Sequence, residues 1–183
     1  LPCLGIHCGY HLVHRNQLPP STKMNLIELA HIKGLYLCSA ESLTSGRVAT
    51  EIAKTPGASR VFLGSFVVYS DASKSAMLDI PKTMIGRDTA VSESVAKAMS
   101  QNSRARFAEA NEIEIADVVS VSTTGVAGPE PVGAKAVGLV LISITSRRGT
   151  LCREYHFSGS RDDITAAATE AALGLLREEL EQI

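Results

Sequence analysis

Two residues of this sequence, Ser42 and Lys74, have the types and surroundings of a nucleophile and its general base. Ser42 lies between an apolar stretch, 35–40, and a helical pattern that begins at Arg47, so the backbone N–H groups after it could face an oxyanion near its hydroxyl. Lys74 is the only basic residue in a small, polar helix start, where the helix dipole opposes its charge and lowers its pKa. A partly neutral lysine can act as general base to a serine, so the pair predicts acyl chemistry.

Both residues also have purely structural interpretations. Ser42 or Thr44 could cap the helix that follows, and Lys74 could be a solvated surface side chain. Gly-x-Ser-x-Gly is absent, which excludes the nucleophile elbow of α/β-hydrolases. Ser94–Lys97 spells Ser-x-x-Lys, but it falls within a helical pattern and lacks the partner motifs of penicillin-recognising enzymes. Local sequence leaves the catalytic and the structural interpretation open.

A second group of residues could hold an anionic substrate. Gly125, Gly128 and Gly133 follow a β-branched stretch, in a loop where backbone amides can approach a phosphate. The loop is only similar to a P-loop, because one residue is inserted before its lysine and a strand pattern follows it, so we reject a Walker-type NTPase. Arg161 starts the last helical pattern, where a guanidinium and a helix dipole could meet the same anion. Pairing of Arg161 with a neighbouring aspartate is the alternative.

Alternating strands and helices must position these residues. Strand patterns cover 35–40, 59–69, 116–123, 137–146 and 151–157, and helical patterns cover 21–34, 47–54, 70–78, 92–110 and the segment after Ser160. The segment between 78 and 92 is expected as a loop, 147–150 as a hairpin turn, and Ser160 with Asp163 as a capping box. This order predicts an α/β fold, a three-layer α/β/α sandwich with a mixed, mostly parallel sheet. Ligands of such folds bind at the carboxyl ends of strands.

Composition excludes several classes of function. The 183 residues include 18 Lys+Arg against 19 Asp+Glu, a net charge of -1, and only 4% of them are aromatic. The chain therefore lacks the basic surface and the stacking side chains expected of a nucleic-acid-binding protein. No apolar run approaches the roughly 20 residues that span a bilayer. The start of the chain also lacks a signal-peptide pattern, so no membrane partner and a cytoplasmic location are expected.

Residues 1–20 are interpreted as an irregular leader, followed by one domain at 21–183. The leader contains five possible metal ligands: Cys3, His7, Cys8, His11 and His14. Their order lacks the paired spacing of zinc motifs, so a loosely ordered leader is favoured over a metal site. Cys38 and Cys152 fall in apolar strand patterns and are expected to be reduced core residues. Neither Gly-x-Gly-x-x-Gly nor His-Glu-x-x-His occurs, and no cofactor is expected.

Several motifs follow one another in a fixed order along the chain. They are Ala40–Gly46, Gly64-x-x-Val67-x-Tyr69-Ser70-x-x-x-Lys74, Ala90–Glu93, Thr124–Pro129, Val137-Gly138 and Phe157-x-Gly159-x-Arg161. Over roughly residues 24–180, the sequence closely resembles the C-terminal domain of the competence/damage-inducible CinA family. The resemblance implies an α/β/α domain that hydrolyses the carboxamide of nicotinamide mononucleotide to nicotinate mononucleotide and ammonia. It also implies a homo-oligomer, most simply a dimer.

The residues and the resemblance combine into one mechanism. Ser42 attacks the carboxamide carbon, and Lys74 takes its proton and later protonates the departing ammonia. Tyr69 is placed with this catalytic pair by its motif position. The other expected site residues are Thr44, Ser45 and Gly46 for the oxyanion, and Arg161, Thr124, Gly125 and Gly128 for the nucleotide phosphate. No metal ion is required by this mechanism.

The chain departs from the family pattern in two loops. The family's serine loop reads Glu-Ser-Cys-Thr-Gly-Gly, so Leu43 and Ser45 stand here for Cys and Gly, and Ser45 costs backbone freedom. The loop 130–136 also differs and is one residue shorter than the family pattern. Two alternatives therefore stay open: a related amide or nucleotide substrate, and a catalytically degenerate domain that binds a nucleotide or a protein partner.

Overall fold

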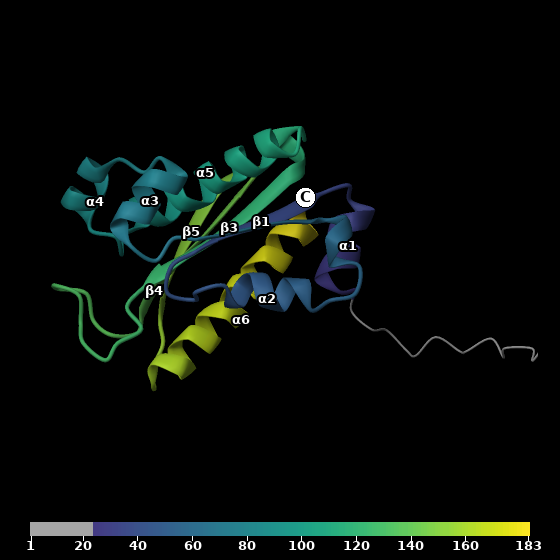
Figure 1. The fold of residues 1–183 in the computed structure, drawn as a ribbon. Coiled ribbons are helices and arrows are strands. Elements are labelled where there is room, and N and C mark those ends of the chain that lie inside the picture. The colour runs from purple at the N-terminus through teal and green to yellow at the C-terminus, as the bar shows by residue number, and fades with distance from the viewer. Residues whose placement is uncertain (1–23) are drawn as a thin grey trace, which may run out of the picture.

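The structure, a computed structural model, describes residues 24–183, so the predicted leader and its possible metal ligands lie outside the described residues. A five-stranded sheet in the order β2-β1-β3-β4-β5 forms its centre (Figure 1). The strands are β1 (Tyr36–Glu41), β2 (Phe62–Val67), β3 (Val118–Gly125), β4 (Leu139–Ser146) and β5 (Gly149–His156). β1 is parallel to β2 and β3, and β4 is antiparallel to β3 and β5. Four strands thus share one direction, and the predicted mixed, mostly parallel sheet is confirmed.

Helices cover both faces of the sheet. They are α1 (Leu26–Ile32), α2 (Arg47–Ala53), α3 (Asp71–Leu78), α4 (Lys82–Asp88), α5 (Glu93–Ala110) and α6 (Arg161–Gln182). Helices α1, α2 and α6 lie on one face, and α3, α4 and α5 lie on the other (Figure 1). The larger hydrophobic cluster lies beneath α1, α2 and α6, and a smaller one lies beneath α3, α4 and α5. The predicted three-layer α/β/α sandwich is therefore confirmed.

The element boundaries follow from local caps and turns. α1 begins later than predicted, because Asn25 and Glu28 form its capping box. β2 is shorter than predicted, because a 3-10 turn at Ala58–Arg60 precedes it. The predicted capping box of Ser160 and Asp163 at the start of α6 is confirmed.

The segment between α3 and α5 corrects the prediction of a loop. Helix α4 occupies it, starting directly after Pro81, whose fixed φ suits a helix start. Ile85 is the buried side chain of this short helix. One buried side chain gives too little hydrophobic periodicity for a sequence pattern to indicate a helix.

The two described cysteines, Cys38 and Cys152, are both free thiols. Cys38 is fully buried in β1, and this burial raises its pKa to about 12. Cys152 in β5 is partly buried. The prediction of a core residue is confirmed for Cys38, whereas Cys152 is only partly buried.

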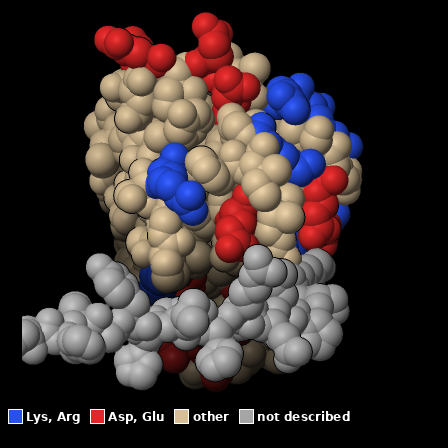
Figure 2. Space-filling view, turned by 90° about the vertical axis from the view of Figure 1, so that its right-hand side faces the viewer, with Lys and Arg blue, Asp and Glu red and all other residues tan. Residues whose placement is uncertain are grey.

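The surface carries mixed charge. On the face that Figure 2 shows, acidic and basic side chains are interspersed over mostly uncharged surface, in keeping with the net charge of -1. Among residues 24–183, none of the helices combines the length and the hydrophobicity that crossing a membrane requires.

The parallel strands bring three loops to one edge of the sheet. Glu41, the last residue of β1, is paired with Val67 on one side and with Thr123 on the other. The segments that follow β1, β2 and β3 therefore leave the sheet side by side, as expected for the carboxyl ends of parallel strands. These segments carry the serine, the lysine and the glycine-containing loop of the sequence analysis.

Candidate active site

Ser42 and Lys74 meet at this edge of the sheet. Ser42 directly follows β1, and Lys74 lies in α3, which follows β2. The Lys74 Nζ donates a hydrogen bond to Ser42 Oγ at 3.2 Å and another to the Tyr69 carbonyl oxygen at 3.3 Å. Ser42 is 8% exposed and Lys74 is 1% exposed. The interpretation of Lys74 as a solvated surface side chain is therefore wrong.

Burial is the main electrostatic influence on Lys74. Loss of solvent around the ammonium lowers the pKa of Lys74 below its ordinary value of 10.5, and the nearby Asp71 carboxylate partly raises it. Asp71 Oδ1 lies 4.0 Å from Lys74 Nζ, and its side chain is 64% exposed. The lowered pKa of Lys74 was predicted from the helix dipole, whereas desolvation by burial is its main cause. Asp71 was not identified from the sequence, although it precedes Lys74 by three residues.

The loop after Ser42 leaves two backbone donors available. The Ser45 amide donates to the Ser42 carbonyl oxygen at 3.2 Å, and the Gly46 amide donates to Glu41 Oε2 at 2.8 Å. Within the described part of the chain, the amides of Leu43 and Thr44 have no hydrogen-bond acceptor. The prediction that Ser45 and Gly46 donate to the oxyanion is therefore wrong, because their N–H groups already have acceptors. Thr44 stays a candidate, and Leu43 is a candidate that the sequence analysis missed.

The backbone of this loop explains why the sequence departure at Ser45 matters. Ser45 has a φ of +51°, in the left-handed region that glycine adopts most readily. Gly46 follows at the N-cap of α2 with a φ of +93°, and no side chain caps that helix from the N-cap position. The alternative that Ser42 or Thr44 caps α2 is therefore wrong, since neither residue occupies the cap.

Glu41 supplies the acceptor that α2 needs, a role that was not predicted from the sequence. It is fully buried at the end of β1. Six donors reach its two carboxylate oxygens: the side chains of Ser39, Thr44 and Ser65, at 3.3, 2.7 and 3.2 Å, and the amides of Gly46, Val48 and Ala49, at 2.8, 3.1 and 2.8 Å. An acidic residue between a buried strand and a helix start was the signal that could have identified it.

Arg161 connects two of the loops at the mouth of the site. Its guanidinium donates to Tyr69 Oη at 3.1 Å and to the carbonyl oxygen of Gly128. The Tyr69 side chain is largely exposed, at 57%. Asp162 forms an ion pair with Arg47. The alternative that Arg161 pairs with a neighbouring aspartate is therefore wrong.

The remaining residues expected around the phosphate have structural contacts of their own. Thr124 Oγ1 donates to the carbonyl oxygen of Ala90 at 2.8 Å, so its hydroxyl anchors the segment before α5. A side chain at Gly125 would come within 2.6 Å of the backbone oxygen of Leu139, so this glycine allows β3 and β4 to approach each other closely. Both residues line the cleft, but these contacts account for them without a ligand.

Two cavities flank the contact between Tyr69 and Arg161. The first has a volume of about 390 Å³ and contains Ser42, Lys74 and the loop 124–132. The second, of about 560 Å³, is lined by Arg47 and by loop residues 43–45. Tyr69 and Arg161 line both cavities. The first cavity is the candidate active site, because it holds a nucleophile in contact with a base and has the size of small-molecule sites.

Metal ligands are not gathered at this site. Residues 24–183 contain no group of three or more His, Cys, Asp or Glu side chains that could hold a metal ion. The donors that line the first cavity are three hydroxyls, an amine, a guanidinium and backbone groups. Such a set suits the polarisation of a carbonyl group by hydrogen bonds.

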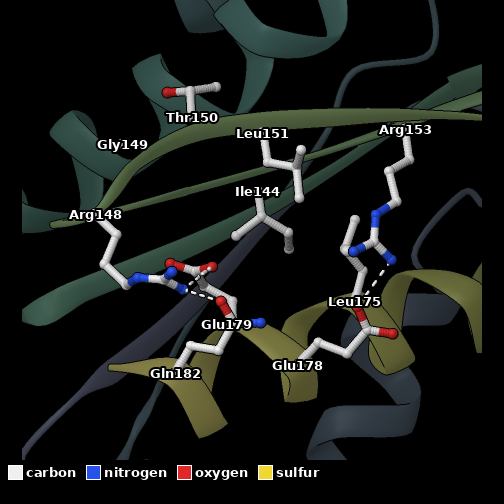
Figure 3. Close-up of a pocket in the computed structure, with 10 residues that line it drawn as sticks. All are labelled: Ile144, Arg148, Gly149, Thr150, Leu151, Arg153, Leu175, Glu178, Glu179 and Gln182. Atoms are coloured by element: carbon white, nitrogen blue, oxygen red, sulfur yellow. Dashed lines mark hydrogen bonds and ion pairs between the residues drawn. The ribbon is translucent and has the colours of Figure 1, made fainter.

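A separate groove of about 280 Å³ lies between β5 and the C-terminal half of α6 (Figure 3). Arg148 pairs there with Glu179 at 3.2 Å, and Arg153 pairs with Glu178 at 2.8 Å. The charged side chains that span the groove thus neutralise one another. Its ten lining residues include no serine, cysteine or lysine, so the groove has no pair comparable to Ser42 and Lys74.

Comparison with known sequences finds relatives that are described as CinA-like proteins. A CinA-like protein of Desulfotalea psychrophila is 36% identical over 151 residues, which are 82% of this chain and 35% of that protein. A CinA-like protein of Geobacter metallireducens is 34% identical over 148 residues, 80% of this chain and 34% of that protein. The chain spans about a third of the length of the curated relatives it matches.

Solved structures with the same fold are also found. The competence/damage inducible protein CihA of Agrobacterium tumefaciens is 30% identical with a TM-score of 0.73, covering 85% of this chain and 95% of that one. A competence or damage-inducible protein of Enterobacter asburiae is 26% identical with a TM-score of 0.74, covering 86% and 99%. The model of the CinA C-terminal domain family matches residues 21–180. With its fold, its motifs and these relatives in agreement, the chain belongs to the CinA C-terminal domain family.

Proposed function

We propose that this domain hydrolyses the carboxamide of nicotinamide mononucleotide, giving nicotinate mononucleotide and ammonia, through Ser42 and Lys74. The observation that carries the proposal is the 3.2 Å contact between Lys74 Nζ and Ser42 Oγ, with both side chains buried at the wall of one cavity. A nucleophile in hydrogen-bond reach of its base is the arrangement that covalent acyl transfer requires.

The reaction follows from the protonation state of the lysine. Because burial lowers the pKa of Lys74, a larger fraction of its amine is neutral near pH 7 than for an exposed lysine. The neutral amine takes the proton of Ser42 as Oγ attacks the carboxamide carbon. The resulting ammonium then protonates the departing nitrogen, ammonia leaves, and an ester to Ser42 remains. Water, deprotonated by the same amine, attacks the ester carbon. The ammonium then returns its proton to the departing Ser42 Oγ, and the acid is released.

Two further groups support catalysis on this substrate. The unoccupied amides of Leu43 and Thr44 lie directly after the nucleophile and would donate to the oxyanion of the tetrahedral intermediate. Arg161 stands at the start of α6 and lines the same cavity, where its guanidinium would bind the nucleotide phosphate. Its contact with Tyr69 fixes that side of the cleft.

Ammonia release from nicotinamide mononucleotide tests the proposal directly. The wild-type protein is expected to turn over, and Ser42→Ala and Lys74→Ala are each expected to lose about 10²-fold or more. Lys97→Ala is the matched control, since Lys97 pairs with Glu93 on the exposed face of α5 and should retain full activity. Full turnover by both site variants would exclude the mechanism.

A catalytically degenerate binding domain is the second candidate, and the altered loop 130–136 favours it. Calorimetric titration with nicotinamide mononucleotide separates it from the enzyme. Binding without any release of ammonia by the wild-type protein would support the degenerate domain.

A further inference from the structure

We propose that Glu41 is a positioning residue for this hydrolysis: its buried carboxylate fixes the loop 42–46 so that the amides of Leu43 and Thr44 stay available to an oxyanion beside Ser42. This inference rests on the proposed function and deepens it. Glu41 does not contact the cavity, so it acts through the backbone that it holds.

The bonding of Glu41 exceeds what a single helix cap needs. Its oxygens accept six hydrogen bonds, three from side chains and three from backbone amides at the start of α2, whereas one or two suffice for a cap. A carboxylate suits this environment, because it offers acceptors only, while an amide side chain would point its NH₂ group at one or two of the backbone N–H groups. The charge and shape of Glu41 are thus matched to its surroundings.

The same contacts decide which amides can receive an oxyanion. An anion at a helix start would ordinarily be bound by the first N–H groups of the helix. Here Glu41 already takes the amides of Gly46, Val48 and Ala49. The amides that have no acceptor are therefore those of Leu43 and Thr44, which directly follow Ser42 in the chain.

Thr44 is held from two sides. Its hydroxyl donates to Glu41 Oε2 at 2.7 Å and lies 2.7 Å from Thr123 Oγ1 in β3, and the residue is only 1% exposed. The backbone of Thr44 is thereby tied to both β1 and β3. Because a donor must be aimed at the developing charge before the reaction starts, this fixation is what an oxyanion site needs.

Glu41 also connects the serine loop with the lysine. Its carbonyl oxygen accepts the amide of Val68 at 2.9 Å, just before the segment that leads through Tyr69 to Lys74. The residue thus joins the two loops that supply the nucleophile and the base. Its side chain orders one loop, and its backbone aligns the other.

Glu41→Gln tests the inference at nearly constant volume. At Oε1 the new NH₂ group would face the Ala49 amide, and at Oε2 it would face the amides of Gly46 and Val48. Either orientation leaves a backbone amide at the start of α2 without its acceptor, so the loop loses its fixed geometry. We expect kcat for ammonia release to fall by about 10²-fold, with KM changing less than about threefold. Asn25→Ala is the matched control: it removes the capping box of α1, the first helix of the described residues, and should lower the melting temperature while leaving kcat unchanged.

A second readout is independent of substrate recognition. A fluorophosphonate probe forms a phosphonate ester with the oxygen of an activated serine and releases fluoride, and its P=O oxygen needs the same donors as the oxyanion. Labelling of Ser42 should slow in Glu41→Gln by a factor comparable to the loss in kcat, with Ser42→Ala as the blank. Should Glu41→Gln fail to fold, Thr44→Val removes the hydroxyl between Glu41 and Thr123 and is expected to slow labelling about tenfold.

The outcomes separate this inference from the proposed function. Wild-type turnover with unchanged kcat and labelling in Glu41→Gln or Thr44→Val would overturn the role of Glu41 and leave the proposed function standing. Labelling of the wild type without ammonia release would refute the substrate, and the labelling rates would then decide the role of Glu41. A wild-type protein that shows no labelling and no turnover would refute both the proposed function and the role of Glu41.

Discussion

Replacing Lys74 by methionine is expected to abolish amide hydrolysis and, at neutral pH, to stabilise the fold. Methionine keeps an unbranched chain of similar volume but carries no charge and no base. The rate of ammonia release should fall by about 10²–10⁴-fold, the usual contribution of a positioned proton acceptor. Stability should move in the opposite direction, because the site buries an amine for function at the expense of the native state.

The size of the stabilisation follows from the surroundings of the amine. Lys74 is 1% exposed, and its Nζ donates to two neutral oxygens, Ser42 Oγ and the Tyr69 carbonyl. Replacing a buried charge by a well-packed apolar side chain is often neutral or stabilising by about 1–4 kcal/mol. Asp71 at 4.0 Å offsets part of the burial cost, but it is mostly exposed and therefore screened. We expect a gain of about 1–2 kcal/mol in the free energy of unfolding.

The pH dependence of this gain has a definite sign. In the native state burial lowers the pKa of Lys74, and unfolding restores it to about 10.5. Between these two pKa values the unfolded state binds more protons than the native state, so the stability of the wild type rises with pH there. The advantage of Lys74→Met should thus be largest below the lowered pKa and shrink as the pH rises toward 10.5.

Urea denaturation of both proteins at pH 7 and pH 10 measures the difference. Lys97→Met is the control, because its pairing with Glu93 raises the pKa of Lys97, so the stability from this pair is present at neutral pH and lost as the pH rises through the raised pKa. That variant should be neutral or slightly less stable at pH 7. A Lys74→Met protein less stable than the wild type at pH 7, or one whose advantage grows toward pH 10, would refute the reasoning.

Three other substitutions give separable outcomes. Asp71→Asn removes the carboxylate that raises the pKa of Lys74, so the acidic limb of the kcat profile should move to lower pH; an unmoved limb would contradict this assignment. Arg161→Ala removes the guanidinium proposed to bind phosphate, so steady-state kinetics should show KM rising about tenfold or more with a smaller change in kcat; an unchanged KM would exclude that role. Gly138→Ala places a Cβ against the carbonyl oxygen of Phe157 at a φ of +92°, and thermal unfolding should show a loss of about 1–3 kcal/mol or more; a stability equal to the wild type would contradict the clash.

Most of the fold could be predicted because its elements carry strong local signals. β3 and β4 are continuous buried strands, and α6 begins with a capping box, so their patterns indicate both type and approximate limits. The errors fell where the local signal is weak. Helix α4 buries one side chain, and a 3-10 turn shortens β2, and neither feature has a hydrophobic periodicity of its own.

The candidate site was predictable only in part. Ser42 and Lys74 were singled out by residue type and by their places between a strand and a helix. The availability of individual amides was not predictable, because it depends on which acceptors tertiary packing brings near. Ser45 and Gly46 were expected to donate to an oxyanion, and their amides are occupied by Ser42 and Glu41 instead.

The sequence by itself determined the order of strands and helices, the mixed sheet and the residues able to do acyl chemistry, because periodicity, caps and side-chain chemistry are local properties. Only the tertiary structure decided that Lys74 is buried against Ser42, that Glu41 occupies the start of α2, and that Arg161 reaches Tyr69. The physical reason is that desolvation and hydrogen-bond saturation are set by neighbours far apart in the chain. The parallel pairing of β1 with β2 and β3 brings those neighbours to one edge of the sheet.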